Sequence, residues 1–163
     1  MFGFFNKKGK HENCLKAPVN GTVVPMTEAS DETFASCMLG NGVVIHPSDG
    51  MVTAPCGGEI TGFMEDSKHA VGLKTEYGFD LLLHIGIDTV SLQGQGFESF
   101  IKPGQKVKTG DRLVRFDKAL IESKGLCADV IMIVLDSPEL KPIDYRTGIQ
   151  SEAGETVVAE IFI

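Results

Sequence analysis

Phe79-Asp80-Leu81-Leu82-Leu83-His84-Ile85-Gly86-Ile87 predicts one β-strand, because its apolar residues alternate with other side chains. One face is wholly apolar and consists of Leu81, Leu83, Ile85 and Ile87. The other face consists of Asp80, Leu82, His84, Gly86 and Asp88. The apolar face predicts burial in a core, which places His84 on the opposite, more polar face.

Similar short strands are expected along the rest of the chain, each bounded by Gly, Pro, Asn or Asp. The 19 glycines and 7 prolines among the 163 residues favour many short turns. The other expected strands are 21–24, 43–45, 51–54, 58–61, 69–73, 112–116, 130–135 and 156–163. A helix is expected only over 118–124. We therefore expect an all-β protein, an antiparallel sandwich or barrel with short helical turns only.

A weak internal duplication supports this architecture. Ala17-Pro18-Val19-Asn20-Gly21-Thr22-Val23 is similar to the later segment Ala54-Pro55-Cys56-Gly57-Gly58-Glu59-Ile60. After each copy come a glycine, a few apolar residues and a histidine, which is His46 in the first case and His84 in the second. Two similar halves that close on each other would remove exposed sheet edges.

Composition and charge exclude several classes of protein. The 22 acidic and 15 basic residues give a net charge of −7, which disfavours nucleic acid as a partner. No apolar run approaches the roughly 18 residues of a membrane-spanning helix. Cys14, Cys37, Cys56 and Cys127 lack the close spacing of metal or redox motifs, so we expect reduced thiols in the cytoplasm. We expect no metal and no cofactor.

The first 16 residues differ in charge from the remainder. They carry a charge of +3, and removing it from the total of −7 leaves −10 for residues 17–163. The tail contains Phe2, Phe4 and Phe5 before its lysines. We predict a flexible tail over 1–16 and one domain over 17–163. Aromatic and basic residues also suit weak contact with an anionic membrane surface, so we expect the protein to reach the inner face of the membrane through this tail.

A hairpin argument brings a second histidine to His84. Thr75-Glu76-Tyr77-Gly78 joins strand 69–73 to strand 79–87. If the loop has two or four residues, His69 lies opposite His84, and opposed residues point to the same side with Cβ atoms about 4.5–5.5 Å apart. The same register pairs Ser67 with Gly86 and Val71 with Leu82. An odd-numbered loop would shift the register and separate these residues.

Two facing imidazoles permit two kinds of chemistry. They could bind zinc opportunistically, although catalytic zinc usually has three protein ligands. Alternatively, one histidine is a nucleophile that takes up a phosphoryl group while the other imidazole and Ser67 donate hydrogen bonds to it. Because no glycine-rich nucleotide loop is present, the phosphoryl donor would be another protein.

The segment Leu82-Leu83-His84-Ile85-Gly86-Ile87-Asp88-Thr89-Val90, followed by Leu92-Gln93-Gly94-Gln95-Gly96-Phe97, closely resembles a family signature. The family is that of the glucose-type EIIA components of the bacterial phosphoenolpyruvate-dependent sugar phosphotransferase system. The similarity covers essentially residues 17–163. It implies an antiparallel β-sandwich with an internally duplicated, barrel-sandwich hybrid core. It also implies a phosphotransferase component of sugar uptake.

The resemblance implies roles for the three polar residues. His84 corresponds to the histidine that accepts a phosphoryl group on Nε2 from the phosphohistidine of HPr and passes it to a cysteine of an EIIB domain. His69 corresponds to the auxiliary histidine that steadies the phosphoryl group. Ser67 stands where the family commonly has threonine, and it would bond the phosphoryl group or His69. Since family members also regulate other proteins, regulatory protein targets are a further expectation.

A partner-docking surface is expected around the histidines. The resemblance assigns Phe34 and Val90 to this surface, and Asp31 and Asp88 to the acids that meet the basic HPr. Val71 and Leu82 extend it, since the predicted register places both beside the histidines. Glu65 stands where the family usually has an aromatic residue, so either the register slips there or the docking surface is altered.

A lipoyl- or biotinyl-type carrier is the alternative. Residues 102–113 followed by Asp117-Lys118-Ala119 resemble a lipoyl domain modified at Lys118. In that fold the lysine sits at a hairpin tip, whereas here residues 120–124 continue as a helix.

Overall fold

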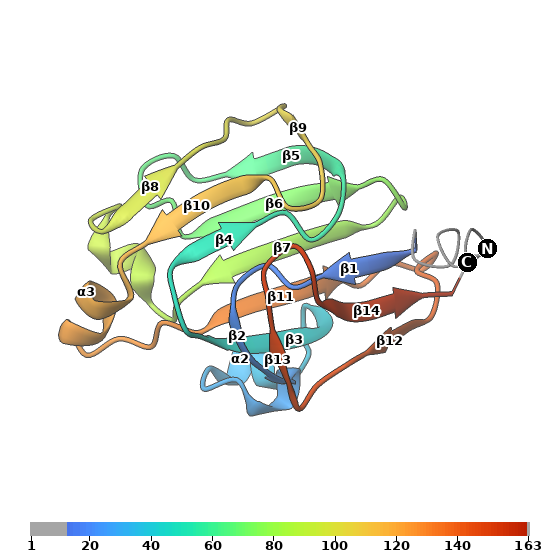
Figure 1. Ribbon diagram of the computed structural model, residues 1–163, viewed down its shortest axis with the longest axis horizontal. Helices are drawn as coiled ribbons and strands as arrows, with labels where there is room; N and C mark the ends of the chain where they lie inside the picture. The colour runs from blue at the N-terminus through green and yellow to red at the C-terminus, as the bar shows by residue number, and fades with distance from the viewer. Residues whose placement is uncertain (1–12, 163) are drawn as a thin grey trace, which may run out of the picture.

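The structure is a computed structural model of the chain, and it describes residues 13–162 (Figure 1). Its strands are β1 (Cys14–Lys16), β2 (Gly21–Pro25), β3 (Gly40–Pro47), β4 (Met51–Thr53), β5 (Gly58–Phe63), β6 (Ala70–Thr75), β7 (Asp80–Ile85), β8 (Phe97–Ser99), β9 (Lys106–Val107), β10 (Arg112–Phe116), β11 (Val130–Leu135), β12 (Ile143–Tyr145), β13 (Ile149–Ser151) and β14 (Val157–Ile161). The short helices are η1 (Met26–Glu28), α2 (Glu32–Ala35), η2 (Thr89–Leu92) and α3 (Lys118–Ser123).

Within residues 13–162, the strands form three antiparallel sheets. The large sheet has the order β13-β2-β3-β11-β7-β6-β5-β9, and the two small sheets have the orders β4-β10-β8 and β1-β14-β12. Figure 1 shows β4, β8 and β10 lying over β5, β6 and β7. The main core fills the space between these layers, with Val52, Leu83 and Leu113 fully buried in it. The predicted antiparallel β fold with short helices is therefore confirmed.

The expected strands are present, with shifts of a few residues at their ends, but five further strands were not predicted. These are β1, β8, β9, β12 and β13, each of two or three residues. Such short strands show too little alternation to be identified from sequence. The predicted helix is α3, which begins after Asp117, whose carboxylate accepts the N–H of Leu120 at 3.0 Å.

The sequence duplication corresponds to a structural one. The N–H of Lys16 donates to the carbonyl of Pro55 at 2.8 Å, and the N–H of Thr53 donates to the carbonyl of Pro18 at 2.7 Å. Lys16 and Thr53 occupy equivalent positions in the two copies, and so do Pro18 and Pro55. Each copy therefore donates one of these two bonds to the other copy. The halves thus close on each other, as the repeat predicted.

Strand β1 lies within the segment that the sequence assigned to the tail. It pairs with β14, and Leu15 is fully buried. The folded part therefore includes residues 14–16. Residues 1–12 of the predicted tail lie outside the described residues.

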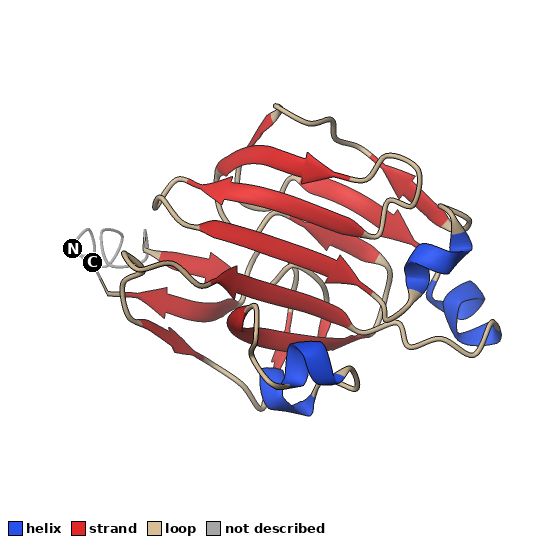
Figure 2. Cartoon of the chain, turned by 180° about the vertical axis from the view of Figure 1, so that it is seen from behind, coloured by secondary structure: helices blue, strands red, loops and turns tan. Residues whose placement is uncertain are grey.

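The large sheet has a second apolar face, which positions the functional residues. Along β11, Val130 and Met132 point into the main core, whereas Ile131 and Ile133 pack with Met26, Phe34 and Val44 on the other side. Figure 2 shows this side from behind, with short helices against the sheet. His84 is paired with Ile131 and therefore lies on this second face, as the alternation of its strand predicted.

Candidate functional site

His84 is held in one orientation at the end of β7. Its Nδ1 lies 2.8 Å from the carbonyl oxygen of Gly86. A carbonyl oxygen only accepts hydrogen bonds, so Nδ1 carries the proton and Nε2 keeps its lone pair. The ring of Phe34 lies beside the imidazole, with centroids 5.0 Å apart at an angle of 55°. This geometry leaves the lone pair of Nε2 available for bonding.

Gly86 makes this orientation possible by ending the strand. Its φ of +79° lies in the left-handed region, and a Cβ there would lie 2.4 Å from Cγ2 of Thr89. Its N–H donates to the carbonyl of Asp129 at 2.7 Å, which anchors the turn beside β11. A side chain at this position would be both strained and crowded.

His69 lies beside His84, but the predicted register is wrong by one residue. The N–H of Thr75 donates to the carbonyl of Phe79 at 2.9 Å, which leaves a loop of three residues, 76–78, so Ala70 rather than His69 pairs with His84. The N–H of Ile85 donates to the carbonyl of His69 at 2.7 Å. The rings nevertheless have centroids 4.9 Å apart and an interplanar angle of 84°. His69 precedes β6 and follows Lys68, whose φ is +56°, so the strand alternation does not apply to its side chain.

Ser67 fixes the ring of His69. Its Oγ lies 2.7 Å from Nδ1 of His69, and both residues are buried. If the hydroxyl donates to Nδ1, Nε2 of His69 carries a proton and can donate a hydrogen bond to a third group. This arrangement complements His84, because one ring then offers a lone pair and the other a donor.

Burial favours the neutral form of both imidazoles. Desolvation is the main cause that lowers the pKa of His84 below its ordinary value of 6.5, against opposing contributions from the Gly86 carbonyl, Asp31 and Asp88. The pKa of His69 is also lowered, by burial and then by the neighbouring His84. A neutral imidazole retains the lone pair that nucleophilic attack requires.

The two histidines line one small pocket with four of the predicted docking residues. This pocket of about 200 Å³ is lined by Asp31, Thr33, Phe34, His69, His84, Asp88 and Val90. The carboxylate of Asp31 accepts the N–H of Thr33 at 2.8 Å and so begins α2, the helix that carries Phe34. Thr33 was not singled out from the sequence, because an exposed threonine in a short helix gives no signal by itself.

The prediction for Val71 is wrong, whereas Leu82 lies on the expected face. Val71 pairs with Leu83 and is fully buried in the main core. The cause is the same one-residue shift, since a slip by one residue moves a side chain to the other face of a sheet. Leu82 is half-buried and packs against the second apolar cluster.

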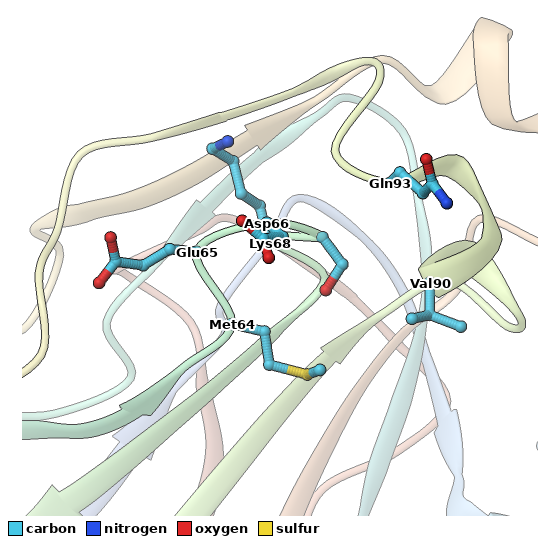
Figure 3. A pocket seen from close by; sticks show the side chains of 7 residues that line it. Met64, Glu65, Asp66, Lys68, Val90 and Gln93 are labelled. Atoms are coloured by element: carbon cyan, nitrogen blue, oxygen red, sulfur yellow. The ribbon is translucent and has the colours of Figure 1, made fainter.

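A larger pocket of about 780 Å³ adjoins the histidine pocket and shares Val90 with it (Figure 3). Figure 3 shows Met64 and Val90 on facing sides of this pocket, while Glu65 points away. Met64 is about half exposed and Phe63 packs against the main core. Strand β5 also has a register shift between Ile60 and Gly62. At the rim of this pocket, where the family resemblance led us to expect an aromatic residue, the exposed side chain is that of Met64.

The other candidate chemistry finds less support. Lys118 lies in the first turn of α3, with its Nζ 3.8 Å from a carboxylate oxygen of Glu122, and not at a hairpin tip. No group of three or more His, Cys, Asp or Glu side chains within residues 13–162 is arranged to hold a metal ion.

Between Asn13 and Phe162, no helix has the length and apolar character needed to cross a membrane.

Comparisons with known proteins agree with the geometry. Residues 13–140 match the family described as phosphoenolpyruvate-dependent sugar phosphotransferase system, EIIA 1. The glucose-specific EIIA component of Halalkalibacterium halodurans is 40% identical over 99% of this chain and 95% of that protein. That of Bacillus cereus is 35% identical over 99% of this chain and 96% of its own length.

A solved structure shows the same fold. The glucose permease IIA from Mycoplasma capricolum superposes with a TM-score of 0.77 at 35% identity, over 90% of this chain and 93% of that one. Both the sequence and the structure of this chain are thus similar to those of EIIA proteins along nearly their whole length. The chain therefore belongs to the EIIA family of the phosphoenolpyruvate-dependent sugar phosphotransferase system, and it acts in phosphoryl transfer during sugar uptake.

Proposed function

We propose that His84 is the residue that carries the phosphoryl group, with HPr as donor and a cysteine of an EIIB domain as acceptor. The observation that carries this proposal is the hydrogen bond from Nδ1 of His84 to the Gly86 carbonyl, with a second imidazole 4.9 Å away. Membership of the EIIA family implies both partners. We extend the proposal to glucose as the sugar, because the relatives above are named glucose-specific.

In the first half-reaction, Nε2 of His84 attacks the phosphorus of phosphohistidine in HPr. A P–N bond forms on His84 while the P–N bond of the donor breaks, and the donor imidazole leaves. The lowered pKa of His84 keeps its lone pair free, and the Nδ1–H bond to Gly86 stabilises the ring as Nε2 gains positive character. The phosphoryl group then sits next to His69.

In the second half-reaction, a thiolate of EIIB attacks the same phosphorus. A P–S bond forms, the P–N bond to Nε2 breaks, and His84 returns to its neutral state. His69 donates through Nε2 to a phosphoryl oxygen, where negative charge is concentrated during transfer. Ser67 acts through His69, since its hydroxyl bonds Nδ1 of that ring and holds it in place.

The partners dock on the surface around the pocket. Phe34, Leu82 and Val90 supply apolar contact, and Asp31 and Asp88 supply negative charge toward a basic HPr. Met64, about half exposed on the rim of the adjoining pocket, extends this surface. A shallow site suits this function, because two different proteins must reach the same nitrogen.

We place this reaction in the cytoplasm, where EIIA proteins usually act. A weak contact of residues 1–16 with the inner face of the membrane stays a prediction, and so do regulation of other proteins and opportunistic zinc binding at the two histidines.

The test is phosphorylation of the purified chain by phosphoenolpyruvate, enzyme I and HPr, followed by intact-mass analysis. The wild-type protein should gain one phosphoryl group that is lost in acid, as expected for an imidazole phosphoramidate. His84→Ala should gain none, and the matched control His46→Ala should be phosphorylated normally. Label that persists in His84→Ala would reject the proposal.

A further inference from the structure

A groove with one apolar wall lies at the end of β6 and β7 opposite to the histidine site. Its volume is about 200 Å³, and its apolar wall comprises Tyr77, Phe79, Leu140 and Ile161. The rings of Tyr77 and Phe79 stack with centroids 6.1 Å apart at an angle of 22°. Three polar residues, Ser137, Glu139 and Lys141, also line the groove. No part of the phosphoryl-transfer site uses this groove.

The described chain begins at the rim of this groove. The carbonyl of Asn13 accepts the N–H of Ile161 at 2.9 Å. The hydroxyl of Tyr77 bonds both the N–H and the carbonyl of Cys14, at 3.3 Å and 3.2 Å. The first two described residues are therefore attached to two residues of the groove wall, and residues 1–12 continue from that point.

We propose that one of the three phenylalanine rings of residues 2–5 docks into this groove of its own chain. Apolar cavities of about 150 Å³ hold a benzene ring, so the groove has room for one phenyl group. Residues 6–12 separate Phe5 from Asn13 and can span up to about 25 Å, which is enough to turn back onto the rim.

Two further observations favour this occupant over a separate partner. The tail is basic, through Lys7, Lys8 and Lys10, whereas residues 17–163 carry a charge of −10. The short connection also gives the phenylalanines an effective concentration in roughly the millimolar range at the groove. A contact too weak to hold between separate molecules is therefore populated within one chain.

Docking has two consequences for function. The groove lies at the opposite end of β6 and β7 from His69 and His84, so a docked tail leaves the phosphoryl site open. Docking also uses the same phenylalanines that would enter a lipid surface. A docked tail therefore has one phenylalanine fewer for the membrane, so the two contacts compete.

The test is a comparison of amide NMR spectra between the full chain and a variant with Phe2→Ser, Phe4→Ser and Phe5→Ser. We expect chemical-shift differences at residues 77–79, 139–141 and 161, independent of protein concentration, with residues 67–69 and 84–88 unchanged. A control that replaces Lys7, Lys8 and Lys10 by Ser should keep most of the groove shifts. These tail variants leave residues 13–163 unaltered, so loss of folding does not confuse the result.

A fluorescence experiment tests the groove side. The chain has no tryptophan, so Phe5→Trp introduces a single indole. Its emission should be blue-shifted, and adding Leu140→Asp should move it toward that of indole in water. Spectra unaffected by loss of the phenylalanines would overturn the proposal. So would shifts that grow with protein concentration, indicating a second copy, or tail signals that respond only to vesicles of anionic phospholipid. Phosphorylation of His84 is expected in every variant, which separates this test from that of the transfer function.

Discussion

Strands β3 and β7 occupy equivalent places on the two sides of β11, yet only β7 bears the site. Ile45 and Ile85 both pair with Val130, and Val44 and His84 both pair with Ile131. Val44 is fully buried in the second apolar cluster, whereas His84 lines an open pocket. The two strands that flank β11 therefore offer two positions of the same kind, and only one of them carries a histidine of the candidate site.

The difference extends beyond the histidine itself. In the first half, β3 runs on through His46 to Pro47. On the other side of β11, the residue that follows the partner of Val130 is Gly86, where the left-handed φ ends the strand and the carbonyl turns back to His84. His46 instead bonds the carboxylate of Asp129 through Nδ1 at 2.8 Å. A histidine near a strand end is thus insufficient, because the glycine turn and the second imidazole make the site.

The largest effect is expected from His69→Gln, which removes the second imidazole beside His84. Transfer of the phosphoryl group to EIIB should fall by about 10²–10³, because a stabilising donor is lost from the transition state. Acceptance from HPr should continue. Rapid-quench measurement of the two half-reactions checks this, with His46→Gln as the matched control. Equal losses in both half-reactions would make His69 merely structural.

Gly86→Ala should disturb the left-handed turn whose carbonyl holds the ring of His84. We expect a loss of about 1–3 kcal/mol in the free energy of unfolding from left-handed strain, and slower transfer as His84 loses its orientation. Gly78→Ala is the control, since its φ of +99° is also left-handed but no atom lies within 4 Å of an added Cβ. Denaturant unfolding and the phosphorylation rate measure the two effects. If Gly78→Ala slows transfer as much, the account of the turn fails.

Ser67→Ala should have a smaller effect, which acts through His69. Losing one buried hydrogen bond costs about 1–3 kcal/mol, and we expect transfer to EIIB to slow by roughly tenfold. Ser67→Thr keeps the hydroxyl and should retain most of the rate. Kinetics of the EIIB half-reaction distinguish the two variants, and equal rates for them would show that the hydroxyl has no role.

The smallest expected effect is on pH dependence. Because the folded pKa values of His69 and His84 lie below 6.5, the unfolded chain binds more protons near and below that pH. The stability that these residues contribute is therefore full above 6.5 and is lost as pH falls below it. NMR titration of the ring protons should give midpoints below 6.5 for both residues. A midpoint above 6.5 for either residue would contradict the burial argument.

The sequence predicted the pattern of faces well and the exact pairing poorly. The alternation of Leu81, Leu83 and Ile85 places them correctly in the core and His84 on the other face, because burial imposes a period of two. Ile87 was expected on the same core face, but it follows the turn at Gly86 and packs against the second apolar cluster. Loop length is not visible in that pattern, so a three-residue turn displaced Val71 from the predicted surface into the core.

The proximity of the two histidines was predicted for a reason that the structure does not support. It depends on the left-handed residue Lys68 and on the hydrogen bond from Ser67, rather than on opposed positions in a hairpin. Neither feature has a periodic signal. The turn at Gly86 was suggested only by a glycine at the end of an apolar strand, and its role depends on a carbonyl direction that sequence alone does not specify.

The most direct test of the central claim is nitrogen-detected NMR of the histidine rings before and after phosphorylation. The account predicts that unphosphorylated His84 carries its proton on Nδ1, bonded to the Gly86 carbonyl, and that the phosphoryl group appears on Nε2 of His84 alone. His46 should keep its spectrum throughout. A phosphoryl group on Nδ1 of His84, or on His46 or His69, would contradict the account.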